Sequence, residues 1–131
     1  MRTFALLVVL LIVVGGCRTA PIQNVSRAPL TTVSATKVTM ADVSKAISTA
    51  GGRMGWVMQE VRPGELLGIL TVRKHVAVVA ITHDTSTFNI AYKDSQNLMH
   101  QGDEIHRNYN RWVQNLRQAI QSEVARIGAP R

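Results

Sequence analysis

The stretch LLGILTVRKHVAVVAI, residues 66–81, decides the fold. It is rich in β-branched residues, which favour strands, and it is too long for one ordinary strand of about five or six residues. Arg73 and Lys74 interrupt it, so we expect a bend, a bulge or a tight turn there. Beyond that point alternate residues share one face of a strand, namely His75, Ala77, Val79 and Ile81.

Shorter segments on either side extend this strand pattern. Residues 54–61 alternate in the same way, and the Pro63-Gly64 pair predicts a turn after them. Residues 84–87 predict a hairpin turn, and residues 88–92 predict the last strand. Together these segments predict an antiparallel meander of three or four strands.

A helix is expected on each side of the meander. Thr39 and Asp42 form a capping-box pattern, and the glycines at 51–52 end an apolar helical face comprising Met40, Val43, Ala46, Ile47 and Ala50. Residues 102–103 open a longer helix with the apolar stripe Ile105, Tyr109, Trp112, Val113, Leu116, Ile120, Val124 and Ile127. We therefore predict a two-layer α+β domain over residues 39–131, with both helices on one face of the sheet.

The first 16 residues have a different composition. Residues 4–14 are an unbroken apolar run, shorter than the roughly 20 residues that a bilayer-spanning helix needs. The run follows Arg2 and precedes small residues, as in an export signal. The sequence Val14-Gly15-Gly16-Cys17 resembles the lipobox of bacterial lipoproteins. This resemblance implies that residues 1–16 are a cleaved signal peptide and that Cys17 carries the lipid.

Residues 18–38 predict an irregular tether between Cys17 and the domain. They include Pro21 and Pro29, contain no acid, and space their apolar residues without a helical period. Two alternatives remain open. The tether's basic residues could lie against anionic headgroups, and residues 22–25 could dock on the domain as an edge strand.

The charge of the chain indicates an anionic partner. The 131 residues hold 15 Lys and Arg against 8 Asp and Glu, a net charge of +7. Loss of Arg2 with the signal leaves +6, and export removes nucleic acid as the natural partner. An envelope protein, anionic lipid or lipopolysaccharide remains. In lipoproteins an Asp after the lipidated Cys often signals inner-membrane retention. Arg18 at that place favours the outer membrane, facing the periplasm.

The densest polar region covers residues 94–115. Asparagine forms helices poorly, so a helix that contains three of them within residues 108–115 can use their amides for binding. The candidate binding residues are Ser95, Asn97, His106, Asn108, Asn110, Arg111 and Asn115. The alternative is that these groups cap the helix and tie the preceding loop to it.

The sequence offers little for catalysis or metal binding. The side chains of His100, Asp103, Glu104 and His106 could hold a metal, but their spacing matches no zinc pattern. A single cysteine excludes an internal disulfide and a Cys-pair zinc site. The residues Ser34-Ala-Thr-Lys37 match a Ser-x-x-Lys pattern, but they lie in the tether and the partner motifs of such enzymes are missing. We find no phosphate-loop or dinucleotide motif, so we predict no catalytic residue and no cofactor.

Several segments resemble a family of small lipoproteins from Gram-negative bacteria. The segments are Gly55-Trp56, Pro63-Gly64, Arg73-Lys-His75, Ile90-Ala-Tyr92, Ser95-Gln-Asn97-Leu98 and Ile105-His-Arg-Asn-Tyr-Asn-Arg-Trp-Val-Gln-Asn-Leu116. The resemblance implies location and architecture, and it supplies no catalytic residue. We therefore expect a membrane-anchored cell-envelope lipoprotein with a non-catalytic binding or scaffolding domain in the periplasm. The alternative is an envelope enzyme or metal-binding accessory protein that uses the residues near His100 and His106.

Overall fold

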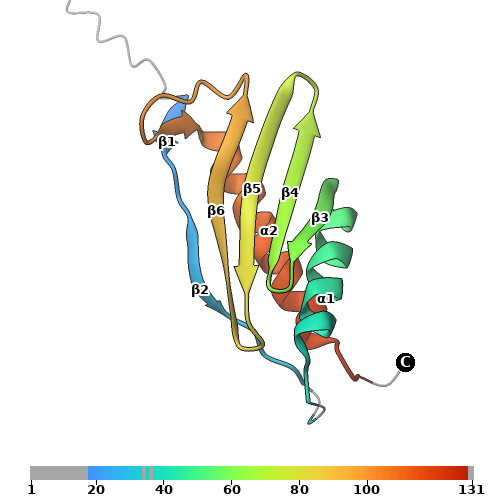
Figure 1. Cartoon of the computed structure of the whole chain (residues 1–131). Helices are drawn as coiled ribbons and strands as arrows, with labels where there is room; N and C mark the ends of the chain where they lie inside the picture. Colours follow the sequence, from blue (N-terminus) through green and yellow to red (C-terminus); the bar gives the residue numbers. More distant parts are fainter. Residues whose placement is uncertain (1–17, 34, 36, 130–131) are drawn as a thin grey trace, which may run out of the picture.

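The structure is a computed structural model that describes residues 18–33, 35 and 37–129 (Figure 1). Its elements are β1 (Thr19–Pro21), β2 (Val25–Pro29), α1 (Met40–Arg53), β3 (Trp56–Arg62), β4 (Glu65–Val72), β5 (His75–His83), β6 (Thr87–Gln96), β7 (Glu104–His106) and α2 (Arg107–Ala125). Five strands form an antiparallel sheet in the order β2-β6-β5-β4-β3, and β1 pairs with β7 separately. The α+β class is confirmed, with a five-stranded main sheet where three or four strands were predicted.

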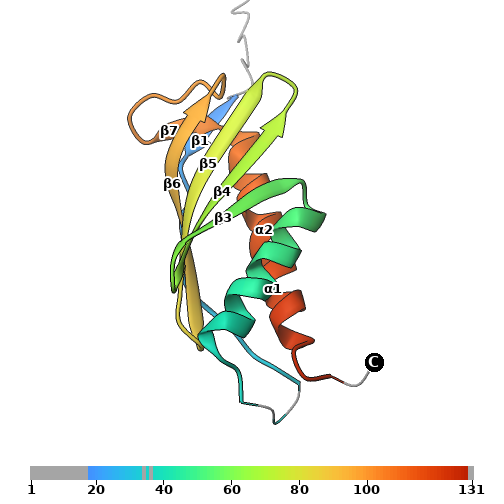
Figure 2. The ribbon, with the colours of Figure 1, turned by 45° about the vertical axis from the view of Figure 1, so that its right-hand side comes forward.

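Both helices lie against the same face of the five-stranded sheet, as Figure 2 shows. The sheet residues on that face are buried: Leu66, Leu70, Ala77, Val79, Ile81, Phe88 and Ile90. The buried helical residues that complete the core include Val43, Ile47, Tyr109, Val113, Leu116 and Ile120. On the opposite face of the sheet, alternate residues stay partly exposed, namely Leu67, Ile69, Val76, Val78 and Ala80.

Residues 66–81 fall into two paired strands joined by a tight turn. Val72 pairs with His75 across the turn, so Arg73 and Lys74 are the two residues of a hairpin loop. Arg73 has a positive φ of 57°, which suits a two-residue hairpin turn and costs a non-glycine residue some strain. Of the three alternatives for this position, the tight turn is therefore the correct one.

The start of α1 confirms the capping-box prediction. The Thr39 hydroxyl accepts from the Asp42 backbone N–H at 3.1 Å, and the Asp42 carboxylate accepts from the Thr39 N–H at 3.0 Å. The bond from the Thr39 backbone N–H, and after it the Thr39 side chain, hold the pKa of the Asp42 carboxyl below its ordinary value. The helix continues past the glycines to Arg53. A side chain at Gly51 would overlap Met58 on β3, so this glycine permits close helix–sheet packing.

The predicted tether is wrong for much of its length, because β1 and β2 are part of the fold. β2 pairs with β6 at the edge of the main sheet, and Val25, Ala28 and Leu30 are buried. A bulge between Val25 and Ala28 breaks the alternation of apolar residues, which is why the sequence pattern did not reveal the strand. Pro29 is tolerated because β2 is an edge strand. The alternative of an edge strand was therefore closer, although the strand begins where residues 22–25 end.

The predicted start of the second helix, at residues 102–103, is also wrong. Gln101 and Glu104 exchange two backbone hydrogen bonds of 3.0 Å around a turn in which Gly102 has a φ of 60°. The chain then forms β7, and α2 begins at Arg107. The apolar stripe of the helix is otherwise confirmed: Tyr109, Val113, Leu116, Ile120 and Val124 are buried, and Trp112 packs against the core.

The predictions for residues 1–17, which include the lipobox and Cys17, lie outside the described residues. Within the part of the chain that the structure describes, neither helix is long and apolar enough to cross a bilayer.

Candidate functional site

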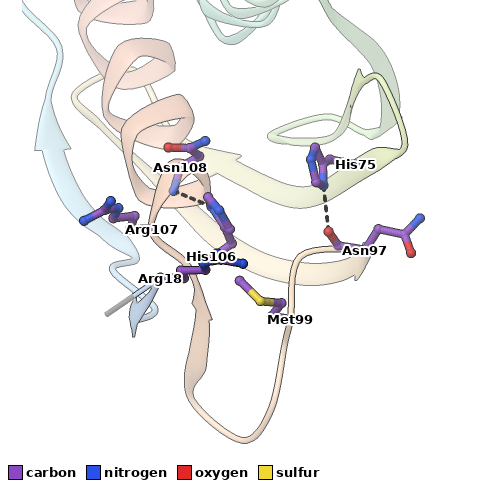
Figure 3. Close-up of a pocket in the computed structure, with 7 residues that line it drawn as sticks. All are labelled: Arg18, His75, Asn97, Met99, His106, Arg107 and Asn108. Carbon is purple, nitrogen blue, oxygen red and sulfur yellow. Dashed lines mark hydrogen bonds between the residues drawn. The ribbon is translucent and has the colours of Figure 1, made fainter. Parts of the chain in front are cut away.

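A cleft of about 440 Å³ opens where the beginning of the described chain meets the start of α2. Seven residues from separate parts of the sequence line it: Arg18, His75, Asn97, Met99, His106, Arg107 and Asn108 (Figure 3). Three of the predicted binding residues, Asn97, His106 and Asn108, are therefore brought together. Arg18, His75, Met99 and Arg107 were not among the predicted site residues.

The hydrogen bonding of His106 fixes which of its nitrogens can serve a ligand. The residue is the N-cap of α2, and its Nδ1 accepts from the backbone N–H of Asn108 at 3.1 Å. An accepting Nδ1 carries no proton, so the proton of the ring is on Nε2. Nε2 is thus available as a hydrogen-bond donor from a ring that lines the cleft.

His75 lines the cleft from the other side (Figure 3). Its Nδ1 is 2.6 Å from the Asn97 carbonyl oxygen, which can only accept, so Nδ1 donates. The Asn97 amide in turn donates to the Lys74 carbonyl at 2.7 Å, which fastens the loop after β6 to the β4–β5 turn. The rings of His75 and His106 are 6.2 Å apart. The cleft is therefore held in shape by hydrogen bonds within its own wall.

Arg18 belongs to the cleft because its backbone is held against α2. Its carbonyl accepts from the Arg107 N–H at 3.0 Å, and the next residue, Thr19, pairs with His106. No local pattern predicts this contact, since 89 positions separate the two arginines. Such a pairing follows from the register of β1 on β7 and not from any local pattern.

The lining of the cleft is basic. Its seven residues include two arginines and two histidines and no acid. The first turn of α2 also has no acidic residue, so the positive end of the helix dipole is not offset by a carboxylate of that turn. In Figure 3 the Arg18 side chain lies beside His106, whereas the Arg107 side chain points outward. This arrangement is suited to bind an anion.

Asn110 has a structural role instead of the predicted binding role. It is buried, its side-chain oxygen accepts from the Gln23 N–H, and its amide donates to the Pro21 carbonyl, both at 2.9 Å. The side chain therefore ties the segment between β1 and β2 to α2. Here the alternative interpretation, in which the polar groups tie chain segments to the helix, is the correct one.

The remaining predicted binding residues lie away from the cleft lining. The Ser95 hydroxyl is 2.9 Å from that of Tyr92. Arg111 is exposed, and Asn115 lines a separate hollow of about 180 Å³ beside Trp56 and Trp112. The structure does not join these three residues to His106.

The residues of the predicted metal alternative have different neighbours. The His100 ring contacts Tyr92, with 4.5 Å between ring centroids, whereas His106 faces His75. Over the described ranges, no three His, Cys, Asp or Glu side chains are grouped so that they could hold a metal ion.

Two further titratable side chains serve the core. The buried His83 donates from Nδ1 to the Asp84 carbonyl at 3.0 Å, and its Nε2 is 2.8 Å from the Ser44 hydroxyl. Burial raises the pKa of Tyr109 well above its ordinary value, so this phenol stays neutral. Neither residue lines the cleft, which leaves the basic cleft as the candidate site.

Comparison of the chain with protein-family models, with curated proteins and with solved structures finds no match. The functional interpretation therefore rests on the residues and geometry of this chain.

Proposed function

We propose that this chain is a lipid-anchored lipoprotein of the bacterial cell envelope, with a non-catalytic domain that binds at the end nearest the anchor. Cys17 carries the lipid, and the domain faces the periplasm from the outer membrane. The partner is an anionic component of the envelope, either a lipid or an acidic protein. The signal-like residues 1–16, the lipobox-like residues 14–17 and the basic cleft support this proposal.

One observation carries the proposal: the residue that follows Cys17 lines the cleft. Arg18 is held by the Arg107 N–H, and adjacent Cα atoms are about 3.8 Å apart. A lipid on Cys17 would therefore be attached one residue away from the cleft. With β1 and β2 packed on the domain, no long linker separates the anchor from the binding end.

The envelope-enzyme and metal-binding alternative has less support. It depends on His100 and His106 acting together, yet their rings contact different aromatic partners. The cleft instead offers hydrogen-bond donors and positive charge, which favour binding of an anion.

Metabolic labelling with a radioactive fatty acid tests the anchor. We expect the wild-type chain to be labelled and the Cys17→Ala variant to be unlabelled, because an alanine has no thiol for the lipid. Arg18→Gln is the matched control, since it changes the adjacent residue and keeps the thiol, and it should be labelled like the wild type. Equal labelling of Cys17→Ala and wild type would overturn the proposal.

Membrane fractionation tests the sorting. Arg18→Asp should move the protein to the inner membrane, while Arg18→Gln should stay in the outer membrane. The same distribution for both variants would contradict the sorting role of this position.

A further inference from the structure

We infer that the basic cleft binds a phosphate group, and that this group belongs to the headgroup of an anionic lipid in the membrane that holds the anchor. The phosphate chemistry follows from the cleft itself. The choice of a lipid as its source rests on the proposed function, because it requires the anchor at Cys17.

The donors around the cleft suit a phosphate. Arginine presents several N–H groups in a planar fork that matches phosphate oxygens, and the Arg18 side chain, which lies beside His106, supplies such a group (Figure 3). His106 adds an Nε2–H donor, because its Nδ1 is occupied by the Asn108 N–H. With no acid in the lining, the charge of Arg18 is not neutralised within the cleft.

The size and polarity of the cleft suit a headgroup better than an acyl chain. Its volume of about 440 Å³ lies within the range of small-molecule sites. Met99 is the one apolar side chain among the seven lining residues, and it is 47% exposed. An acyl chain needs an apolar channel, whereas a phosphate with its glycerol needs polar partners.

The cleft is placed where such a headgroup would be found. The Cα of Arg18 is one peptide unit from that of Cys17, and its carbonyl is bonded to the Arg107 N–H at 3.0 Å. Acyl chains on Cys17 would hold this end of the domain at the level of the lipid phosphates. The anchor would thus bring the cleft and its ligand together without a search through solution.

NMR titration of the full lipidated protein in a neutral detergent tests the inference. The ligands are inorganic phosphate and phosphatidylglycerol added to the micelles, with phosphatidylcholine as the zwitterionic comparison. We expect saturable shifts of the Arg107 and Asn108 amides and of the His106 ring with phosphatidylglycerol, and weaker shifts at the same residues with inorganic phosphate. Shifts with phosphate and none with the lipid would retain the phosphate site but overturn its assignment to a headgroup.

A matched pair of variants separates the cleft from general surface charge. Arg18→Gln should weaken phosphatidylglycerol binding about tenfold, since it removes a charged hydrogen-bond donor beside His106. Arg111→Gln removes the same charge one helical turn away from Arg107, outside the cleft lining, and should change binding by less than about twofold. Equal losses in the two variants, or no saturable shift at the cleft residues, would overturn the inference.

The mass of the same protein sample distinguishes the two proposals. An unmodified Cys17 would overturn the anchor while the titration still decides the phosphate site. A lipidated Cys17 with no response at the cleft would overturn the phosphate site and leave the anchor intact.

Discussion

The two helices of this domain begin in opposite ways. α1 begins with Thr39 and Asp42, whose side chains satisfy backbone N–H groups and place a carboxylate at the positive end of the helix. α2 begins with the His106 ring as its cap, continues with Arg107, and has no acid in its first turn. The start of α1 is therefore capped and charge-balanced by residues next to it in the sequence, whereas the start of α2 leaves positive charge in a cleft.

The start of α1 is capped by neighbouring residues, whereas the start of α2 also makes contacts with distant parts of the chain. Local capping groups serve α1, because the Thr39 and Asp42 side chains accept from each other's backbone N–H groups. At α2, Arg107 holds Arg18, His106 pairs with Thr19, and Asn110 clasps the segment after β1. The start of α2 is thus a junction between distant parts of the chain.

Breaking the junction should have the largest effect. Asn110→Ala leaves the Gln23 N–H and the Pro21 carbonyl without their partner, so we expect the free energy of unfolding to fall by about 2 kcal/mol. Asn115→Ala, an exposed asparagine on the same helix, should change it by less than about 0.5 kcal/mol. Urea unfolding of both variants measures the difference. Equal losses in the free energy of unfolding would show that the two Asn110 hydrogen bonds do not contribute to stability.

Adding an acid to the start of α2 should make it resemble α1. Asn108→Asp places a carboxylate in the first turn, and we expect the free energy of unfolding to rise by about 0.5 kcal/mol. Asn115→Asp introduces the same change in mid-helix and should bring no such gain. If urea unfolding shows no difference between them, the start of α2 does not carry uncompensated positive charge.

The smallest effect is expected when the pH is lowered and the Asp42 carboxylate at the start of α1 takes up a proton. The pKa of Asp42 is lowered in the folded state, so its contribution to stability is present above the unfolded pKa of about 4 and is lost as the pH falls through the lower folded value. The stability difference between wild type and Asp42→Asn should therefore shrink as the pH falls below about 4. A difference that stays constant with pH would contradict this assignment.

Asp84→Asn is the comparison for that experiment. The pKa of Asp84 is also lowered, first by the Ser86 backbone N–H and then by that of Thr87, in the turn before β6. Its effect has the same sign and should persist in the Asp42→Asn variant, because the two turns share no partner.

Elements with a local signal could be predicted from the sequence. The capping box at Thr39 and the alternation around Arg73 depend on neighbours within a few residues, and both were found at the predicted places. β2 was missed because its bulge at residues 25–28 breaks the alternation on which such predictions depend. The residues at 102–103 misled because a glycine and an acid suit a tight turn as well as a helix start.

The candidate site was predicted only in part, for a related reason. Asn97, His106 and Asn108 fall in the dense polar region of residues 94–115, and they do line the cleft. Arg18 and His75 reach it only through strand pairing, which no local pattern encodes. Asn110 is of a residue type that often binds ligands, but it is buried and its amide donates to the Pro21 carbonyl at the end of β1. Residue type alone does not distinguish an asparagine that lines a cleft from one that makes buried structural hydrogen bonds.

The attachment of β1 also has a mechanical consequence. Figure 1 shows the chain passing from β1 along β2 to the opposite end of the domain before it enters α1. A pull on the chain at Arg18 would load the three residue pairs of β1 with β7 and the Asn110 clasp before it reached β2. Because β7 leads directly into α2, tension would pass into the longer of the two helices described here rather than stretch a slack linker.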